Sequence, residues 1–136
     1  MAIVSLVCET CQNAIDGYVG QSVSDCRLVW HRSLACPHCK TAIEEDGMGM
    51  PPYELRQAIL AQEGVWSLTI WETGDRAIVA TKILREAMTL SLSEAMKIKR
   101  KIPGKAIEGT QAEVTWLARC LEKRGITSCI LPENRK

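Results

Sequence analysis

The pattern of apolar and polar positions is clearest in the second half of the chain. Residues 66–71 alternate between apolar and polar or amphipathic side chains, which predicts a β-strand. Apolar residues then recur at helical spacing in three segments. A short apolar run stands before the third segment and another stands after it. Helices are predicted after the turn at 72–75, over 92–101 and between 110 and 125, and short strands at 105–108 and 126–131.

Two of the predicted helices begin with a capping box. Ser91 is followed three residues later by Glu94, and Thr110 by Glu113. In this motif the hydroxyl accepts a hydrogen bond from the later backbone N–H, while the carboxylate accepts one from the earlier N–H. Gly125 is placed to end the last helix in a left-handed conformation.

These elements predict an α+β fold. The order strand, helix, helix, strand, helix, strand gives residues 65–136 a three-stranded sheet with helices on one face. Residues 1–46 form a separate cysteine-rich domain. Acidic residues, two glycines and a proline pair interrupt the chain between 44 and 52, so we expect a linker over 47–64 that includes a short helix at 53–63.

Composition limits the possible classes of protein. A chain of 136 residues with 46% hydrophobic and 24% charged residues is globular, and it is long enough for two small domains. The sequence has no apolar run near 18 residues and no signal-peptide pattern before Cys8. We therefore expect a cytoplasmic protein without a membrane span.

Four of the seven cysteines stand in two Cys-x-x-Cys pairs, which is the strongest chemical signal in the chain. The pairs, Cys8/Cys11 and Cys36/Cys39, are separated by 24 residues, enough for a β-hairpin that includes strands near 18–19 and 27–30. Two such turns present four thiolates to one tetrahedral ion, which predicts a zinc-ribbon-like domain. Because all four ligands come from protein, the Zn²⁺ would be structural, and it would stabilise a segment too small to fold alone.

Other readings of the cysteines and histidines remain open. Iron is the main competitor for the four thiolates, and a disulfide framework with one free thiol is the alternative to a metal site. Cys26, His31 and His38 are further candidate ligands, and Cys26 with His31 a candidate nucleophile and base, although no orienting group is visible. Cys120 and Cys129 are expected to be small buried hydrophobic residues.

Charge divides the chain. Residues 1–64 hold 4 Lys/Arg against 8 Asp/Glu, and residues 65–136 hold 13 against 8. The basic residues of the second half cluster on the first two predicted helices and just after them, which suggests a partner-binding face; an ordinary solvated face is the alternative. The residues expected to bind a partner are Lys82, Arg85, Lys97, Arg100 and Lys101.

The stretch from Trp66 to Leu131 resembles the C-terminal domain of the bacterial ribosomal stalk protein. That family has a Lys-x-x-Arg helix followed by a Leu-containing turn and Glu-Ala, matched here by Lys82 and Arg85 and then by Leu90, Leu92, Glu94 and Ala95. The two turn glycines of the family are replaced by Thr89 and Ser91. The resemblance implies that this helix pair docks protein partners and carries no catalytic residues.

The closing segment 125–133 is similar to the last strand of the Clp protease adaptor, which shares the stalk-domain fold. The adaptor's paired aspartates and ligand-binding histidine are not matched, so the resemblance implies the fold without the peptide pocket. We therefore expect a non-enzymatic interaction module or adaptor, with a partner in translation or proteolysis, or a toxin that it neutralises. The alternative is a nucleic-acid-binding zinc ribbon, although the first half is acidic and only 4% of residues are aromatic. No small-molecule substrate is expected.

Overall fold

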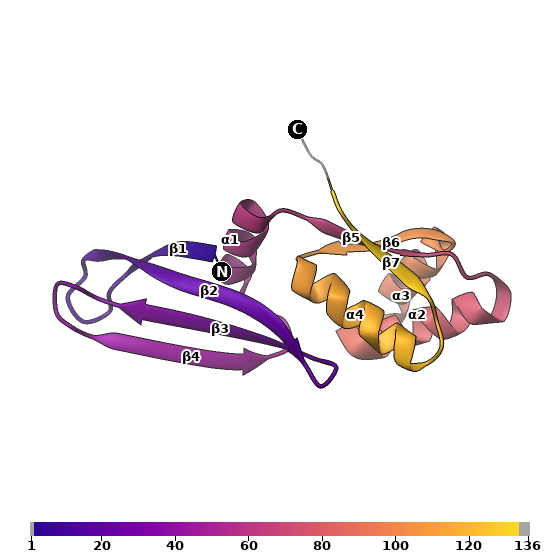
Figure 1. Cartoon of the computed structure of the whole chain (residues 1–136), viewed down its shortest axis with the longest axis horizontal. Coiled ribbons are helices and arrows are strands. Elements are labelled where there is room, and N and C mark those ends of the chain that lie inside the picture. Colours follow the sequence, from indigo (N-terminus) through magenta and orange to yellow (C-terminus); the bar gives the residue numbers. More distant parts are fainter. Residues whose placement is uncertain (1, 134–136) are drawn as a thin grey trace. The chain divides into compact units, whose positions relative to one another are not determined.

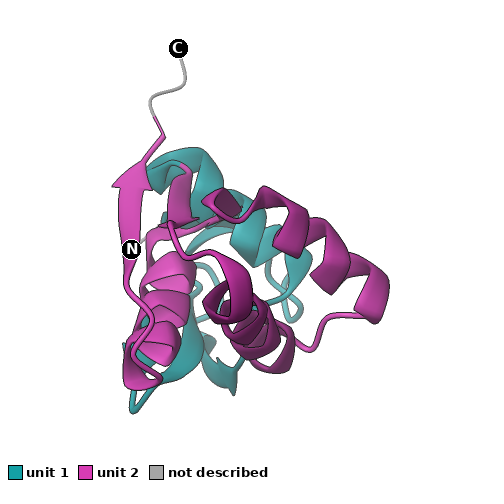
Figure 2. Ribbon diagram, turned by 90° about the vertical axis from the view of Figure 1, so that its right-hand side faces the viewer, with its two compact units in different colours: residues 1–64 teal, residues 65–136 magenta. Residues whose placement is uncertain are grey.

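The computed structural model describes residues 2–133, and so Met1 and 134–136 of the two predicted domains lie outside the described part. Within residues 2–133, seven strands in two antiparallel sheets and four helices confirm the α+β fold class (Figure 1). The chain divides into two compact units, 1–64 and 65–136 (Figure 2). None of the helices in the described part is both long and apolar enough to span a membrane.

The first unit is an antiparallel sheet of consecutive strands followed by one helix. Its elements are β1 (Ala2–Val7), β2 (Ala14–Ser24), β3 (Arg27–Ala35), β4 (Ala42–Met48) and α1 (Tyr53–Glu63). The strands pair in the order β1-β2-β3-β4. Because neighbouring strands run in opposite directions, the β1–β2 and β3–β4 loops leave the same end of the sheet (Figure 1).

Helix α1 belongs to the first unit. The sequence suggested a linker over 47–64, but α1 buries Leu55 and Ile59 in a cluster with Ala2 and Val19 of β1 and β2. These two side chains lie four residues apart and so face the sheet together. The helix therefore covers part of one face of the sheet.

Strand β4 crosses the segment where the sequence predicted an interruption. That prediction is wrong for residues 44–48, because Gly47, which was taken as a chain breaker, lies opposite Trp30 in the β3–β4 register; the strand ends at Met48, and residues 49–52 form the interruption that was expected. The Trp30 indole covers the glycine so closely that a Cβ there would overlap the ring. A strand glycine of this kind marks a close approach of a neighbouring side chain and not the end of the strand.

A side chain from α1 pairs with the backbone of the edge strand β1. The Ile3 N–H donates to Gln62 Oε1 over 2.8 Å, and Gln62 Nε2 donates to the Ile3 carbonyl. The Gln62 amide from α1 thus takes the place of a neighbouring strand at this residue. Edge groups satisfied in this way are not open to pairing with another chain.

The second unit follows the order strand, helix, helix, strand, helix, strand. Its elements are β5 (Trp66–Ile70), α2 (Gly74–Met88), α3 (Leu92–Lys101), β6 (Gly104–Gly109), α4 (Gln111–Lys123) and β7 (Ser128–Pro132). The sheet order is β6-β5-β7, with β5 in the centre and antiparallel to both neighbours. Figure 1 shows the three helices on the same side of this sheet.

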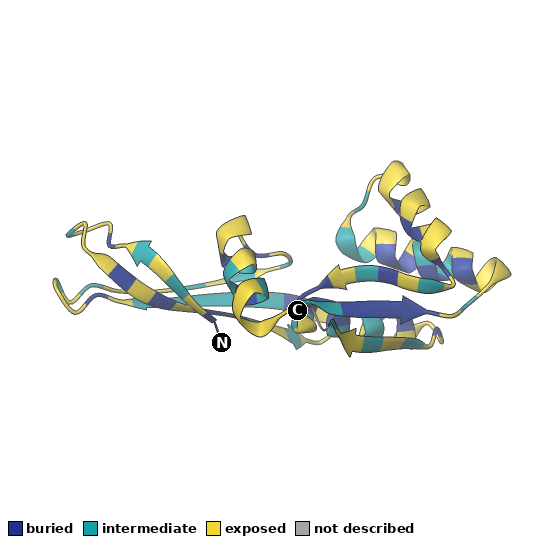
Figure 3. Cartoon of the chain, turned by 90° about the horizontal axis from the view of Figure 1, so that it is seen from above, coloured by how far each residue is buried: buried dark blue, intermediate teal, exposed yellow. Residues whose placement is uncertain are grey.

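The core of the second unit lies between the central strand and the helices. Residues 67–70 of β5 are all buried (Figure 3). Large side chains from the strand and from α2 and α4 are fully buried in this unit: Leu68, Ile70, Leu84, Val114, Leu117 and Leu121. Burying each such side chain contributes on the order of 2 kcal/mol, so an apolar core stabilises this unit.

Both predicted capping boxes are confirmed, in different surroundings. Glu113 N–H donates to Thr110 Oγ1 and Thr110 N–H to Glu113 Oε1, each over 3.1 Å, and both residues are buried. Ser91 and Glu94 form the same pair at the exposed start of α3. Hydrogen bonds from Ser91 lower the pKa of Glu94 below its usual value, and the bond from the Ser91 backbone N–H has a larger effect than the bond from its side chain.

We predict that the buried cap contributes more to stability than the exposed one. Thr110→Ala removes a buried acceptor and should lower the free energy of unfolding by about 2 kcal/mol, against about 1 kcal/mol for the matched Ser91→Ala. Urea denaturation of both variants measures the difference. A Ser91→Ala loss equal to or larger than the Thr110→Ala loss would contradict it.

Candidate metal centre

The two Cys-x-x-Cys pairs lie in the two loops at one end of the first sheet. Cys8 and Cys11 lie in the loop between β1 and β2, and Cys36 and Cys39 in the loop between β3 and β4. The intervening 24 residues fold as the β2–β3 hairpin, which returns the chain to its starting end. The hairpin predicted from the spacing is therefore present, and it brings the second pair to the first.

The two loops share the same backbone hydrogen bonds and a left-handed residue at the same position. In the first, Cys8 N–H donates to the Asn13 carbonyl over 2.9 Å and Gln12 N–H to the Cys8 carbonyl over 2.8 Å, with Gln12 at φ 64°. The second loop repeats these bonds at equivalent positions: Cys36 N–H to Thr41, 2.8 Å; Lys40 N–H to Cys36, 2.9 Å; Lys40 φ 65°. Each loop is a tight turn that directs both sulfurs to one side.

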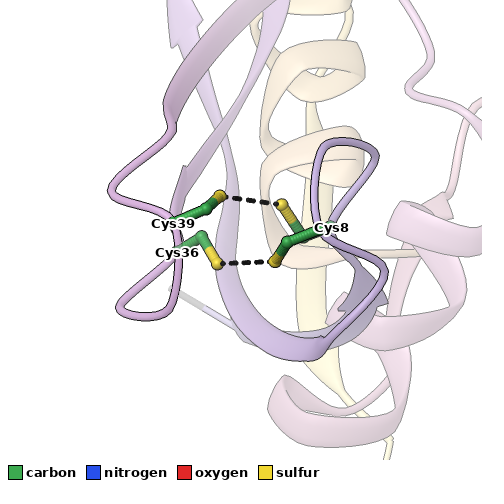
Figure 4. Close-up of side chains that lie close together, drawn as sticks. Cys8, Cys36 and Cys39 are labelled. Atoms are coloured by element: carbon green, nitrogen blue, oxygen red, sulfur yellow. Dashed lines mark hydrogen bonds between the residues drawn. The ribbon is translucent and has the colours of Figure 1, made fainter.

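The four sulfur atoms are close enough to bind one ion. Cys8 Sγ lies 3.6 Å from Cys39 Sγ, and Cys11 Sγ lies 3.6 Å from Cys36 Sγ (Figure 4). All four sulfurs lie within 4.8 Å of one another. A zinc ion with four Zn–S bonds of about 2.3 Å needs sulfurs about 3.8 Å apart, so the spacing fits the ion.

The environment of the four sulfurs is uneven. Cys8 and Cys36 are buried with Ile15, whereas Cys11 and Cys39 are half-buried. Hydrogen bonds from Asn13, first from its backbone and then from its side chain, lower the pKa of Cys11. The Thr41 hydroxyl, followed by its backbone N–H, lowers the pKa of Cys39 to about 6.

Cys36 shifts in the opposite direction. The Cys39 amide lowers its pKa, burial raises it, and the neighbouring Cys11 and Cys39 sulfurs raise it further, so that it rises to about 11. Four thiols this close together cannot all ionise without a counter-charge, because the resulting thiolates repel one another. A bound cation supplies that charge, because a metal deprotonates the thiols that coordinate it.

The remaining cysteines and histidines lie outside this cluster. Cys26 occupies the turn between β2 and β3 with φ 59°, and the ring of His31 lies over Gly20. His38 is exposed in the second loop, as expected from the sequence. Cys120 and Cys129 were both predicted to be buried. The prediction is wrong for Cys129, because its position on the edge strand β7 leaves it exposed, and Cys120 is half-buried.

The residues expected to bind a partner lie on two helices that pack together. Lys82 and Arg85 are exposed on α2, and Lys97, Arg100 and Lys101 are exposed on α3. Contacts between α2 and α3 place both sets in one helical pair.

Sequence reasoning missed two groups of residues. The first is the exposed apolar side chains on the same helices, Ile78 and Met96, each 48% exposed. The second is Asn13 and Thr41, whose side chains contact cysteine sulfurs. Their equal offset, two residues after the second cysteine of each pair, was the available signal.

Comparison with known proteins does not assign the chain to a family. No protein-family model matches it, and searches of curated proteins and of solved structures find no match.

We predict that the purified protein contains about one metal ion per chain, measured by elemental mass spectrometry. Cys36→Ser removes one ligand and should lose the ion together with the β-structure of the first unit, which circular dichroism follows. Cys129→Ser, at an exposed site outside the cluster, is the control and should keep both. Wild-type protein purified without metal under reducing conditions would contradict the metal site.

Proposed function

We propose that the chain is a zinc-binding protein-interaction module or adaptor without catalytic activity. In this proposal zinc stabilises the first unit, and the α2–α3 helix pair of the second unit docks a protein partner. The observation that carries the proposal is the group of four cysteine sulfurs within 4.8 Å of one another.

Zinc is favoured over iron by relative affinity. A tetrahedral set of four thiolates suits either metal, but divalent zinc binds a given site more tightly than ferrous iron does. Elemental analysis of the purified protein separates the two.

A structural role for the metal follows from its surroundings. Four protein ligands leave no coordination position for water or substrate. Two clusters of buried side chains in the first unit are small, one of Ala2, Val19, Leu55 and Ile59 and one around the cysteines and Ile15. Cores of this size leave a unit of 64 residues marginally stable, and a metal compensates for the small buried area.

The proposed docking surface contains both apolar and basic exposed side chains. On α2, Ile78, Lys82 and Arg85 are spaced four and three residues apart and so share one side of the helix. On α3, Leu92 and Met96 are 60% and 48% exposed and lie one turn apart. Apolar side chains flanked by cations suit an acidic partner surface with an apolar centre.

The resemblance to the ribosomal stalk domain supports the same class of function. In that family this helix pair contacts translation factors, and Lys82 and Arg85 occupy matching positions. The partner in this proposal is a protein of translation or proteolysis, or a toxin that the chain neutralises.

Nucleic-acid binding is the second candidate, favoured by the excess of 13 Lys/Arg over 8 Asp/Glu in residues 65–136. Titration with duplex DNA and with single-stranded RNA at increasing salt tests it. Tight binding that weakens steeply with salt would support phosphate contacts, and no binding at low salt would remove this candidate.

We predict that reversing the charge of the helix pair abolishes partner binding without unfolding the protein. The amount of partner that co-purifies with the double variant Lys82→Glu/Arg85→Glu should be about tenfold or more below the wild-type amount. The reason is that like charges would then face each other across the interface. The matched control Arg119→Glu/Lys123→Glu changes two exposed cations of α4 and should bind as wild type does. Quantitative co-purification followed by mass spectrometry measures retention, and equal retention by both double variants would contradict the α2–α3 surface.

A further inference from the structure

The two half-buried cysteines each contact a polar side chain from their own loop. Asn13 Nδ2 donates to Cys11 Sγ over 3.2 Å, and Thr41 Oγ1 lies 3.1 Å from Cys39 Sγ. A metal-bound thiolate carries no proton, so the Thr41 hydroxyl is the donor in the bound state.

Asn13 and Thr41 occupy equivalent places in the two loops. Each lies two residues after the second cysteine of its pair and follows a residue in the left-handed conformation, Gln12 or Lys40. That conformation turns the chain back, so that the next backbone carbonyl accepts from the N–H of the first cysteine in the pair. The backbone carbonyl of each residue therefore accepts from the first cysteine, and its side chain, together with its backbone N–H, bonds to the sulfur of the second.

The side-chain bonds are found where burial does not protect the sulfur. Cys8 and Cys36 are 5% and 4% exposed and pack with Ile15, whereas Cys11 and Cys39 are half-buried. Four thiolates around a divalent ion leave two excess negative charges, which hydrogen-bond donors partly offset. Donors also fix the direction of each sulfur, as outer-shell partners do for other metal ligands.

We propose that Asn13 and Thr41 are positioning residues of the metal centre, which orient the Cys11 and Cys39 thiolates and set the affinity for the ion. The inference rests on the proposed zinc site. Asn13 and Thr41 would thus have the same role in the two loops. Apart from the cysteines, the two loops have no residue type in common at equivalent positions. Removing either donor should weaken metal binding while the loop backbone keeps its hydrogen bonds.

The test is competition for Zn²⁺ between the protein and a chelator of known affinity. Asn13→Leu and Thr41→Val keep the approximate shape of each side chain and remove its donor. Each should weaken Zn²⁺ binding about tenfold or more, the range seen when outer-shell partners are lost, and the double variant should weaken it further. Thr10→Val changes an exposed residue of the first loop and should leave the affinity within about twofold of wild type.

Two more variants separate positioning from general loss of structure. Thr41→Ser restores a hydroxyl and should recover most of the affinity that Thr41→Val loses. Asn13→Asp places an acceptor-only carboxylate beside the sulfur and should weaken binding more than Asn13→Leu does, because the two negative charges repel. In the Co²⁺-substituted proteins, the thiolate-to-metal absorption band should shift in Asn13→Leu and Thr41→Val and remain as in wild type in Thr10→Val.

The outcomes distinguish this inference from the proposal on which it rests. If wild type binds one Zn²⁺ and both donor-deleting variants bind it equally tightly, the positioning role is overturned and the zinc site stands. If wild type binds no Zn²⁺, both are overturned.

Discussion

The meeting of four cysteine sulfurs at one end of the first sheet is the contact on which the first unit depends. It joins the β1–β2 loop to the β3–β4 loop, and so it links all four strands at that end. Helix α1 stabilises a different part of the sheet through Leu55 and Ile59. With the proposed ion bound, metal–sulfur bonds join the two loops and supplement the small buried clusters of a unit of this size.

The second unit is stabilised by ordinary packing. The central strand β5 is buried over residues 67–70, and leucines from α2 and α4 complete the core. The buried capping box of Thr110 and Glu113 satisfies the first backbone groups of α4 inside that core. The helix pair α2–α3 of this unit presents an exposed surface of mixed apolar and basic side chains. With the proposed ion bound, the two units are stabilised by different interactions.

Side-chain interactions between neighbouring elements explain details of the first sheet that no single segment shows. Gly47 sits beneath the Trp30 indole, and Gly20 beneath the His31 ring, so both positions lack space for a Cβ. Gln62 reaches from α1 to the edge of β1 and pairs with both backbone groups of Ile3. In each case the contact joins residues that are separated in the chain and brought together by the sheet or by the packing of α1.

The sequence by itself determined the features that depend on short spacings. The helices and strands of residues 65–136 follow from apolar periodicity and from caps such as Ser91 and Thr110, and the four candidate metal ligands follow from two Cys-x-x-Cys pairs. Only the tertiary structure decided that β4 runs through Gly47, that α1 packs on β1 and β2, and that Asn13 and Thr41 contact sulfur. The physical reason is that these features depend on strand register and on contacts between distant residues, whereas helical periodicity, capping boxes and cysteine spacing are complete within a few residues.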